Sequence, residues 1–381
     1  MNKITILHIA QCAGGVDIYL RMLMKNMDKN IFRHTLICSY NYSAQNYSDI
    51  TDLFIQIDMC NPLSFLKDFR AIKKVRKLIK EISPDIIYCH SSKAGGIGRL
   101  AALGLNIPII YNPHGWAFSI VGSHLKSTIY LAIEKLLAHF TTQIIAISNY
   151  EKLIAIQHHI VKLNKIQTIF NGIDLKGIQT QLTNFNITKE QLKIPSNAYI
   201  IGMVGRISKQ KAPDTFVKMA SEIKKEIPEA WFIIVGDGDQ RKDIENMIKD
   251  RGLINCFTIT GWTSYPLSYA SLFNQAVLLS RWEGFGLALT EYMALRKPIV
   301  ATNVDAIPDQ ITNYTNGILV NIDDYKQAAI AVCKIYQDKQ LRNSIINNGE
   351  LRVKAFYDMR RTAIEHEQMI LKLCNREKSN I

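Results

Sequence analysis

The sequence of 381 residues has no apolar run that approaches the ~20 residues of a membrane-spanning helix. Its apolar start, residues 3–10, is short, runs directly into polar Gln11 and lacks the cleavage site of a signal peptide. The seven cysteines are scattered, odd in number and not spaced as zinc ligands. These absences argue against a membrane-spanning protein, a disulfide-stapled secreted protein and a zinc protein, so we expect a reduced, cytoplasmic location.

The charge balance predicts an anionic partner. The chain carries a formal net charge of +13, with 46 Lys and Arg against 33 Asp and Glu. Phosphorylated substrates, an anionic membrane surface and nucleic acid are the partners that such a surplus attracts. No nucleic-acid-binding motif occurs, and aromatic residues are not interleaved with the basic ones, so we expect no nucleic acid partner.

The length and the order of the patterns predict two α/β domains. A chain of this length with 48% hydrophobic residues can bury two cores. Short apolar strand patterns alternate with helical patterns, and the alternation restarts after a polar stretch at 175–197. We therefore predict a doubly wound first domain at 1–174, a linker at 175–197, a doubly wound second domain at 198–355 and a terminal helix at 356–381.

The most informative stretch runs from Ser280 to Pro298, where a buried strand pattern ends, a tight loop follows and a helix begins. The loop Glu283–Gly286 contains two glycines, which permit positive φ and let amide groups approach a ligand. A helix start offers unpaired N–H groups and the positive end of a dipole, which suit a phosphate. Glu283 and Glu291 are eight residues apart, so we expect them on one face of the segment. The alternative is a plain turn with two solvated carboxylates.

Four other loops follow predicted strands. Gly14 and Gly15 precede a helix start, and His114-Gly115 follows a strand that ends near Tyr111. After Gly205, Arg206 and Lys211 can place a guanidinium fork and a point charge on one polyphosphate. The fourth loop is Gly236–Asp239. Its Asp-Gly-Asp could instead hold a divalent metal ion, because two carboxylates at this spacing can bind Mg²⁺ or Mn²⁺.

The clearest amphipathic helix is predicted at 62–82. Its apolar positions recur at steps of three and four residues, and seven Lys and Arg crowd the other sides between Lys67 and Lys80. A solvated surface helix is one interpretation. The other is that residues 65–82 bind an anionic membrane surface, where each basic side chain contributes about 1 kcal/mol.

Taken together, five motifs resemble those of one enzyme family. They are, in chain order, Gly14-Gly15, His114-Gly115, Arg206 with Lys211, Asp237-Gly238, and Glu283 with Glu291 in an E-x7-E pattern. In this combination they resemble the retaining GT-B glycosyltransferases of family 4. The resemblance implies two Rossmann-like domains with the active site in the cleft between them, a nucleotide-sugar donor, retention of configuration, and no metal or other cofactor. It also implies that the helix at 356–381 crosses back to the first domain.

The resemblance also implies roles for particular residues. His114 and Glu283 would be the catalytic residues, with His114 at the reacting edge of the sugar and Glu283 on its hydroxyls. Arg206 and Lys211 would hold the diphosphate, and Glu291 the ribose. The implied donor-binding residues are Gly14, Gly15, Gly205, Arg206, Lys211, Gly236, Asp237, Gly284, Phe285, Gly286, Leu287 and Glu291. The sequence departs from the family pattern at Ala212, where Gly or Asn is common.

The substrate class follows from softer similarities. The segments His90–Gly95 and His114–Trp116 are similar to those of enzymes that extend lipid-linked sugars in bacterial surface polysaccharide assembly. We therefore expect a UDP-sugar donor, with an N-acetylated hexosamine, a lipid-linked or oligosaccharide acceptor, and a peripheral position at the inner face of the plasma membrane. The alternatives are a UDP-sugar 2-epimerase of the same fold, which lacks the Arg/Lys and E-x7-E pairing, and a non-catalytic binder of sugar nucleotides or nucleic acid.

Overall fold

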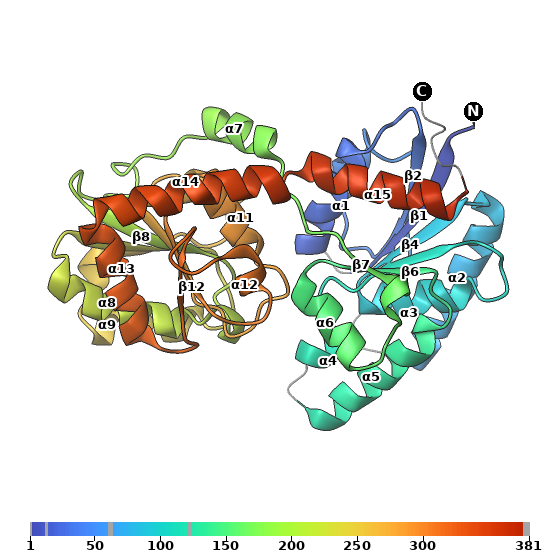
Figure 1. Ribbon diagram of the computed structural model, residues 1–381, viewed down its shortest axis with the longest axis horizontal. Helices are drawn as coiled ribbons and strands as arrows, with labels where there is room; N and C mark the ends of the chain where they lie inside the picture. The colour runs from blue at the N-terminus through green and yellow to red at the C-terminus, as the bar shows by residue number, and fades with distance from the viewer. Residues whose placement is uncertain (1, 12–13, 60–63, 121–122, 376–381) are drawn as a thin grey trace. The chain divides into compact units, whose positions relative to one another are not determined.

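The computed structural model describes residues 2–11, 14–59, 64–120 and 123–375. The chain divides into two compact units, one of Met1–Gly172 with Met359–Ile381 and the other of Ile173–Asp358 (Figure 1). Cys12, Cys60 and the predicted helix start at Pro62 lie outside the described residues. Within the described part of the chain, no helix is both long enough and apolar enough to cross a membrane.

The first unit is built on a seven-stranded parallel sheet in the order β3-β2-β1-β4-β5-β6-β7. Its strands are β1 (Ile4–Ala10), β2 (Phe32–Cys38), β3 (Leu53–Gln56), β4 (Ile86–His90), β5 (Ile109–Asn112), β6 (Gln143–Ala146) and β7 (Ile166–Thr168). Most are continuous apolar runs because helices cover both faces of a parallel sheet. Within β1, Ile6 packs into the core beneath one layer of helices, and the next residue, Leu7, packs into the core beneath the other.

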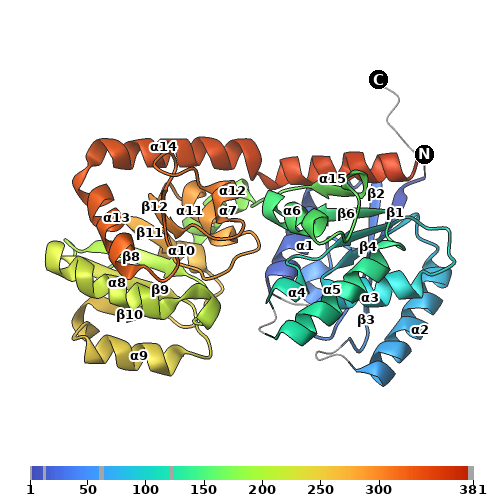
Figure 2. The ribbon, with the colours of Figure 1, turned by 60° about the horizontal axis from the view of Figure 1, so that its bottom comes forward.

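The helices of the first unit form two layers around this sheet. They are α1 (Gly15–Asn26), α2 (Phe65–Ile82), α3 (Ser92–Ala101), α4 (Ala117–Ile120), α5 (His124–Ala138), α6 (Asn149–Gln157) and α15 (Met359–Leu373). Helices α1 and α15 contact each other on one side, and α3 contacts both α2 and α5 on the other (Figure 2). The terminal helix α15 is therefore part of the first unit, although it follows the whole second unit in the chain.

The second unit has a six-stranded parallel sheet in the order β10-β9-β8-β11-β12-β13. Its strands are β8 (Tyr199–Val204), β9 (Ala230–Val235), β10 (Phe257–Ile259), β11 (Gln275–Leu278), β12 (Ile299–Thr302) and β13 (Ile318–Val320). Its helices are α7 (Leu175–Asn184), α8 (Pro213–Glu226), α9 (Arg241–Asp250), α10 (Pro266–Ala270), α11 (Leu287–Ala294), α12 (Ile307–Gln310), α13 (Tyr325–Gln337) and α14 (Lys339–Phe356). Short 3-10 turns occur at Ala44–Tyr47, Leu163–Lys165, Lys209–Lys211 and Ile254–Cys256.

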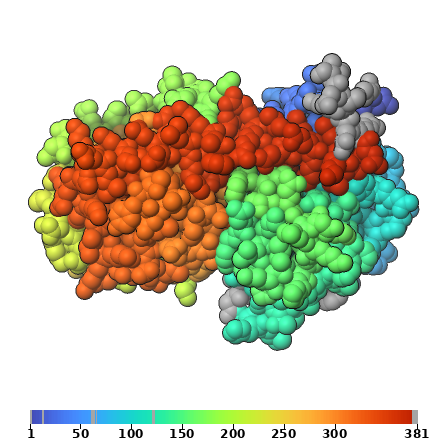
Figure 3. All heavy atoms as spheres, viewed as in Figure 1, coloured from blue at the N-terminus to red at the C-terminus, as the bar shows by residue number. Residues whose placement is uncertain are grey.

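Helix α14 lies on the surface of the second unit (Figure 3) and packs against α11. A glycine permits this close approach, because a Cβ at Gly349 would lie only 3.3 Å from Cγ of Met293. The C-terminal part of α11 is therefore held from outside by a long helix.

Residues 175–197, which we predicted as a linker, contain a helix. Their first half is the helix α7, which belongs to the second unit. The Asp174 side chain caps this helix by accepting a hydrogen bond from the Gly177 amide at 2.9 Å. Beyond the helix, the Phe185 ring stacks on Tyr265 with 3.6 Å between centroids. Leu175, Ile178 and Leu182 are the only large apolar residues of the helix and only Ile178 is buried, so the apolar signal is weak among the surrounding polar residues.

The strand orders locate where each sheet can hold a ligand. In the first unit the chain reverses its direction of travel across the sheet between β1 and β4, and in the second between β8 and β11. In open parallel sheets ligands bind outside the carboxyl ends of the strands at such reversals. We therefore expect functional side chains in the loops that follow β1, β4, β8 and β11.

Candidate active site

Two side chains meet at the reversal of the second sheet. Lys211 lies in the turn after β8, and Glu283 lies in the loop after β11. The Lys211 ammonium donates to Oε2 of Glu283, and the Ser280 hydroxyl donates to the same oxygen at 3.1 Å. The Lys211 and Glu283 side chains are only 17% and 10% exposed. The ion pair is thus largely removed from water, so loss of either partner would leave a buried unpaired charge.

The main chain at and before Glu283 makes hydrogen bonds to neighbouring loops. Its amide donates to Oδ2 of Asp305 at 2.9 Å. The preceding residues join the turn after β8, because the Arg281 amide donates to the Gln210 carbonyl at 2.8 Å. The Gln210 side chain in return donates to the Trp282 carbonyl at 3.1 Å. The two loops at the reversal therefore form one connected structure.

Arg281 reinforces this connection, and sequence reasoning missed it. Its guanidinium pairs with Asp214 at 2.7 Å and with Asp323 at 2.8 Å. It also donates to the Lys209 carbonyl at 2.9 Å. Arg281 stands two residues before Glu283, but its acidic partners are 67 and 42 residues away. No local signal in the sequence could have identified it or Asp305.

Glu291 lies on α11, and its position corrects part of the expected geometry. Helix α11 begins only at Leu287, after Gly286 in the left-handed conformation (φ +80°). Glu283 therefore lies outside the helix, and the two carboxylates do not share a helical face. Lys211 links them instead: it pairs with Glu283 and its charge also acts on Glu291. Desolvation raises the pKa of Glu291 to about 7, and the positive charge of Lys211 partly opposes this rise.

Among the loop residues predicted to bind the donor, Phe285 has a different side-chain environment from the one expected. Its ring is buried and meets Tyr357 edge-on, with 5.6 Å between centroids. The side chain thus belongs to the core, and the Phe285 carbonyl accepts a hydrogen bond from the side-chain amide of Gln310. Gly284 and Leu287 flank it in the loop and at the first position of α11.

The glycines after β8 and β9 have a packing role. A Cβ at Gly236, where φ is +143°, would lie 2.2 Å from the Gly205 carbonyl oxygen. The two loops can therefore run side by side, and the Ile207 amide donates to the Asp237 carbonyl at 2.9 Å. Arg206 projects from the same loop and is exposed.

Asp237 is already engaged by neighbouring groups. Its Oδ1 accepts from the Gly238 amide at 2.8 Å, and its Oδ2 pairs with Arg241 at 2.9 Å. The Gly238 amide, with a contribution from Arg241, lowers the pKa of Asp237. In the described part of the chain, no group of three or more His, Cys, Asp or Glu side chains is arranged to hold a metal ion.

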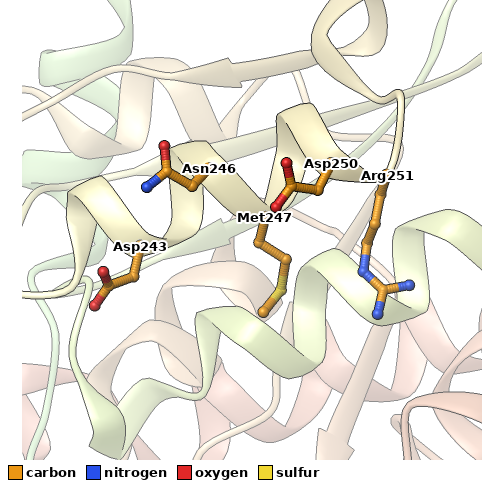
Figure 4. Close-up of a pocket in the computed structure, with 5 residues that line it drawn as sticks. All are labelled: Asp243, Asn246, Met247, Asp250 and Arg251. Carbon is orange, nitrogen blue, oxygen red and sulfur yellow. The ribbon is translucent and has the colours of Figure 1, made fainter.

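A shallow hollow lies along α9 (Figure 4). Asp243, Asn246, Met247, Asp250 and Arg251 line it. Helix α9 begins near the carboxyl end of β9 and ends near the amino end of β10. One of the lining residues, Asp250, is in the last turn of this helix. The hollow thus extends to the edge of the sheet opposite the predicted site.

In the first unit, His114 occupies the loop after β5. Its backbone is left-handed (φ +51°), which is uncommon for a residue other than glycine. Its amide donates to Oδ1 of Asn112 at 2.9 Å, and its Nε2 lies 3.2 Å from Nδ1 of His90. Gly14 caps α1 with φ +94°, and Gly15 begins that helix; a Cβ on either would meet open space.

The fold defines the class of protein. Two parallel-sheet units of this kind are the architecture of the GT-B glycosyltransferases. HepE of Anabaena, solved with UDP and glucose, superimposes with a TM-score of 0.82 at 19% identity, over 96% of this chain and 99% of that chain. Sucrose-phosphate synthase of Thermosynechococcus elongatus gives a TM-score of 0.80 at 21% identity, over 97% and 99%. The predicted fold class is confirmed.

The sequence comparisons then establish the family. The model for glycosyl transferases group 1 matches residues 184–352, and that for Glycosyltransferase Family 4 matches residues 13–176. The chain belongs to these glycosyltransferases, as the motifs predicted.

Curated relatives match along most of their length. The UDP-Gal:alpha-D-GlcNAc-diphosphoundecaprenol alpha-1,3-galactosyltransferase of Escherichia coli is 29% identical over 91% of this chain and 93% of its own. A 41.2 kDa protein of the cps region of Klebsiella pneumoniae is 32% identical over 84% and 86%. The capsular polysaccharide biosynthesis glycosyltransferase CapM of Staphylococcus aureus is 27% identical over 93% of each chain. This chain is accordingly a glycosyltransferase of surface glycan assembly.

Proposed function

We propose that this enzyme transfers a hexose or N-acetylhexosamine from a UDP-sugar to a lipid-diphosphate-linked sugar, with retention of anomeric configuration. The observation that carries the proposal is the cluster of Lys211, Glu283 and Glu291 at the reversal of the second sheet. The Escherichia coli relative is named for a UDP-Gal donor and an undecaprenol-diphosphate acceptor, and HepE was solved with UDP. Both names support the same substrate classes here.

Each residue has a chemical task in this proposal. Lys211 and the exposed Arg206 provide positive charge for the diphosphate, which gains negative charge as the bond to the sugar breaks. Glu291 accepts hydrogen bonds from the ribose hydroxyls, and Glu283 accepts them from the sugar. His114 lies at the reacting edge of the sugar.

The pairing of Lys211 with Glu283 adds one feature to this proposal. The pair holds both side chains in place, so little reorganisation is needed when the diphosphate arrives. A donor then meets a preformed pair of opposite charges, with the cation for its phosphates and the carboxylate for its sugar hydroxyls.

A donor and acceptor screen tests the proposal. Purified protein is incubated with UDP-Gal, UDP-Glc, UDP-GlcNAc or UDP-GalNAc and a polyprenyl-diphosphate-linked GlcNAc, in the presence of EDTA. We expect one donor to be consumed only when the acceptor is present, and the new linkage to be α by NMR. Activity that EDTA abolishes and Mn²⁺ restores would assign Asp237 and Asp239 to a metal. Epimerised UDP-sugar without transfer would favour the epimerase, and binding without turnover would favour a non-catalytic binder.

We further propose that the first unit binds the membrane through a surface that we call the α2–α5 face. On α2, Lys73, Lys74, Lys77 and Lys80 are exposed, and so are the apolar Leu66 and Phe69 near its start. On α5, a stripe at steps of three and four residues is exposed: Leu125, Ile129, Ile133 and Leu136, with Phe140 beyond the helix. Basic side chains attract anionic head groups, and an exposed apolar stripe can enter the acyl boundary.

The two helices can act together because α3 contacts both on the same side of the sheet. This arrangement would keep the enzyme at the inner face of the plasma membrane, where a polyprenyl-linked acceptor resides.

A further inference from the structure

Four histidines form a continuous row across the sheet of the first unit. Nδ1 of His34 lies 3.1 Å from Nε2 of His8, and Nδ1 of His8 lies 3.2 Å from Nε2 of His90. Nδ1 of His90 in turn lies 3.2 Å from Nε2 of His114. His34 lies on β2, His8 on β1 and His90 on β4, and His114 lies in the loop after β5. These four strands are consecutive neighbours in the sheet. His8, His34 and His90 are buried.

The environment keeps these imidazoles neutral. Burial lowers the pKa of His34 to about 4, with Asp52 opposing the shift and Lys29 adding to it. Desolvation and the nearby His366 lower the pKa of His114 to about 3. The pKa values of His8 and His90 are also lowered, by burial first and then by their histidine neighbours.

Neutrality gives the row a direction. A neutral imidazole has one N–H donor and one bare nitrogen that accepts. If each contact in the row is a hydrogen bond, every member donates through one nitrogen and accepts through the other. All four N–H bonds then point the same way along the row, either toward His114 or away from it.

The far end of the row decides between the two directions. Nε2 of His34 is buried and has no hydrogen-bond partner among the described residues. If the row pointed toward His34, this nitrogen would carry a buried N–H without an acceptor. In the opposite direction it carries only an unused lone pair. Orphaned buried N–H groups are rarer than unsatisfied acceptors, so the row donates from His34 toward His114.

We propose that this row holds His114 in the Nδ1–H tautomer, so that His114 offers an N–H donor to an oxygen of the bound donor sugar. His8, His34 and His90 are positioning residues, since they act only through His114. Nδ1 of His114 makes no hydrogen bond to another described residue, whereas Nε2 is occupied by His90. That this N–H binds the donor sugar rests on the proposed function. The tautomer is inferred from the histidine row alone.

The tautomer can be measured directly in the free, full-length protein. Imidazole ¹⁵N shifts of ¹⁵N-histidine-labelled protein distinguish a protonated from a bare ring nitrogen, and the signals of His114 are identified by their loss in His114→Asn. We expect a protonated Nδ1 and a bare Nε2 at neutral pH. A protonated Nε2 in the wild type would overturn the proposal, whether or not the enzyme transfers sugar.

Variants of His90 test the link to the reaction. His90→Leu removes the donor to His114, so we expect mixed tautomers and a kcat lowered about tenfold, the scale of one hydrogen bond, with unchanged affinity for UDP. His90→Gln keeps an amide N–H and should recover much of the rate. The matched control is His366→Leu: it removes another buried imidazole, which contacts Tyr19 and Tyr88 at 3.0 Å but is not a member of the row.

The outcomes distinguish the role of the histidine row from the proposed sugar transfer. Equal losses in His90→Leu and His366→Leu would mean that packing alone is involved, and an unchanged His114 tautomer in His90→Leu would mean that the row does not direct it; either overturns the proposal. If His90→Leu does not fold, the wild-type measurement still decides. A protonated Nδ1 in a protein that transfers no sugar would contradict the proposed function and leave the row intact.

Discussion

The pKa of Glu291 makes a prediction at the scale of a single residue. Because the folded-state pKa is raised to about 7, the side chain is ionised above that pH and protonated below it. We expect the affinity for a UDP-sugar to fall by up to about tenfold for each pH unit below 7, since the ribose hydroxyls lose their carboxylate acceptor. Calorimetric titrations between pH 5.5 and 8 measure this. In Glu291→Gln the dependence should disappear; if it persists there, another group causes it.

The Lys211–Glu283 pair makes a second prediction. Lys211→Met strands a buried carboxylate, so we expect a loss of about 3–5 kcal/mol in the free energy of unfolding. The double variant Lys211→Met/Glu283→Gln should recover much of that loss. Arg206→Met is the control, because Arg206 is exposed and should cost less than about 0.5 kcal/mol.

Denaturant titrations of the wild type, Lys211→Met, Glu283→Gln and the double variant form a double-mutant cycle, and Arg206→Met is measured beside it. Both single replacements of a cation should weaken donor binding, by about 1.5–3 kcal/mol for a lost charged hydrogen bond. Only Lys211→Met should also destabilise the fold. Equal stability of Lys211→Met and Arg206→Met would show that the ion pair is absent from the free protein in solution.

At the scale of elements, the α2–α5 face predicts two separable contributions to membrane binding. Replacing Lys73, Lys74, Lys77 and Lys80 by Gln should weaken binding to anionic vesicles by about 1 kcal/mol per charge and reduce its salt dependence. Replacing Leu125 and Leu136, which are 73% and 61% exposed, by Ser should weaken binding to neutral and anionic vesicles alike.

Vesicle sedimentation measures both effects. Lys242→Gln with Lys249→Gln is the matched control, because these exposed lysines lie on α9 of the other unit. Transfer to a water-soluble acceptor should stay unchanged in every variant. Binding that is insensitive to both sets of changes would make α2 and α5 ordinary solvated helices.

At the scale of the whole chain, the first unit depends on a helix that the chain supplies last. Met359, Ala363 and Ile370 of α15 are fully buried, and each buried Met or Ile side chain contributes about 1.5–3 kcal/mol. Thr362 donates to the Phe170 carbonyl at 2.9 Å, and His366 lies within hydrogen-bonding distance of Tyr19 and Tyr88. The fragment 1–174 would expose all of these groups.

We therefore expect fragment 1–174 to lack a cooperative unfolding transition. Joining residues 359–375 to it through a short Gly/Ser linker should restore that transition, because Gly172 and Met359 are already in contact. Circular dichroism during thermal unfolding compares the two. A deletion of residues 376–381 from the full chain serves as the control, and cooperative folding of 1–174 alone would refute the dependence.

The sequence by itself determined the local features of this protein. Strand and helix periodicity, glycine loops and the spacing of Arg206, Lys211, Glu283 and Glu291 are properties of short segments, so the two α/β units and the family could be predicted from them. The basic face of α2 could be predicted for the same reason.

Only the tertiary structure decided which distant groups meet. Lys211 and Glu283 are 72 residues apart, His8 and His90 are 82 apart, and Tyr19 and His366 are 347 apart. The order of strands in each sheet brings the first two pairs together, and the return of the chain at Met359 brings the third. The exposure of the α5 stripe was equally undecided, since the same apolar spacing serves a buried face or a free one. Partners of this kind depend on packing and topology, which no short segment encodes.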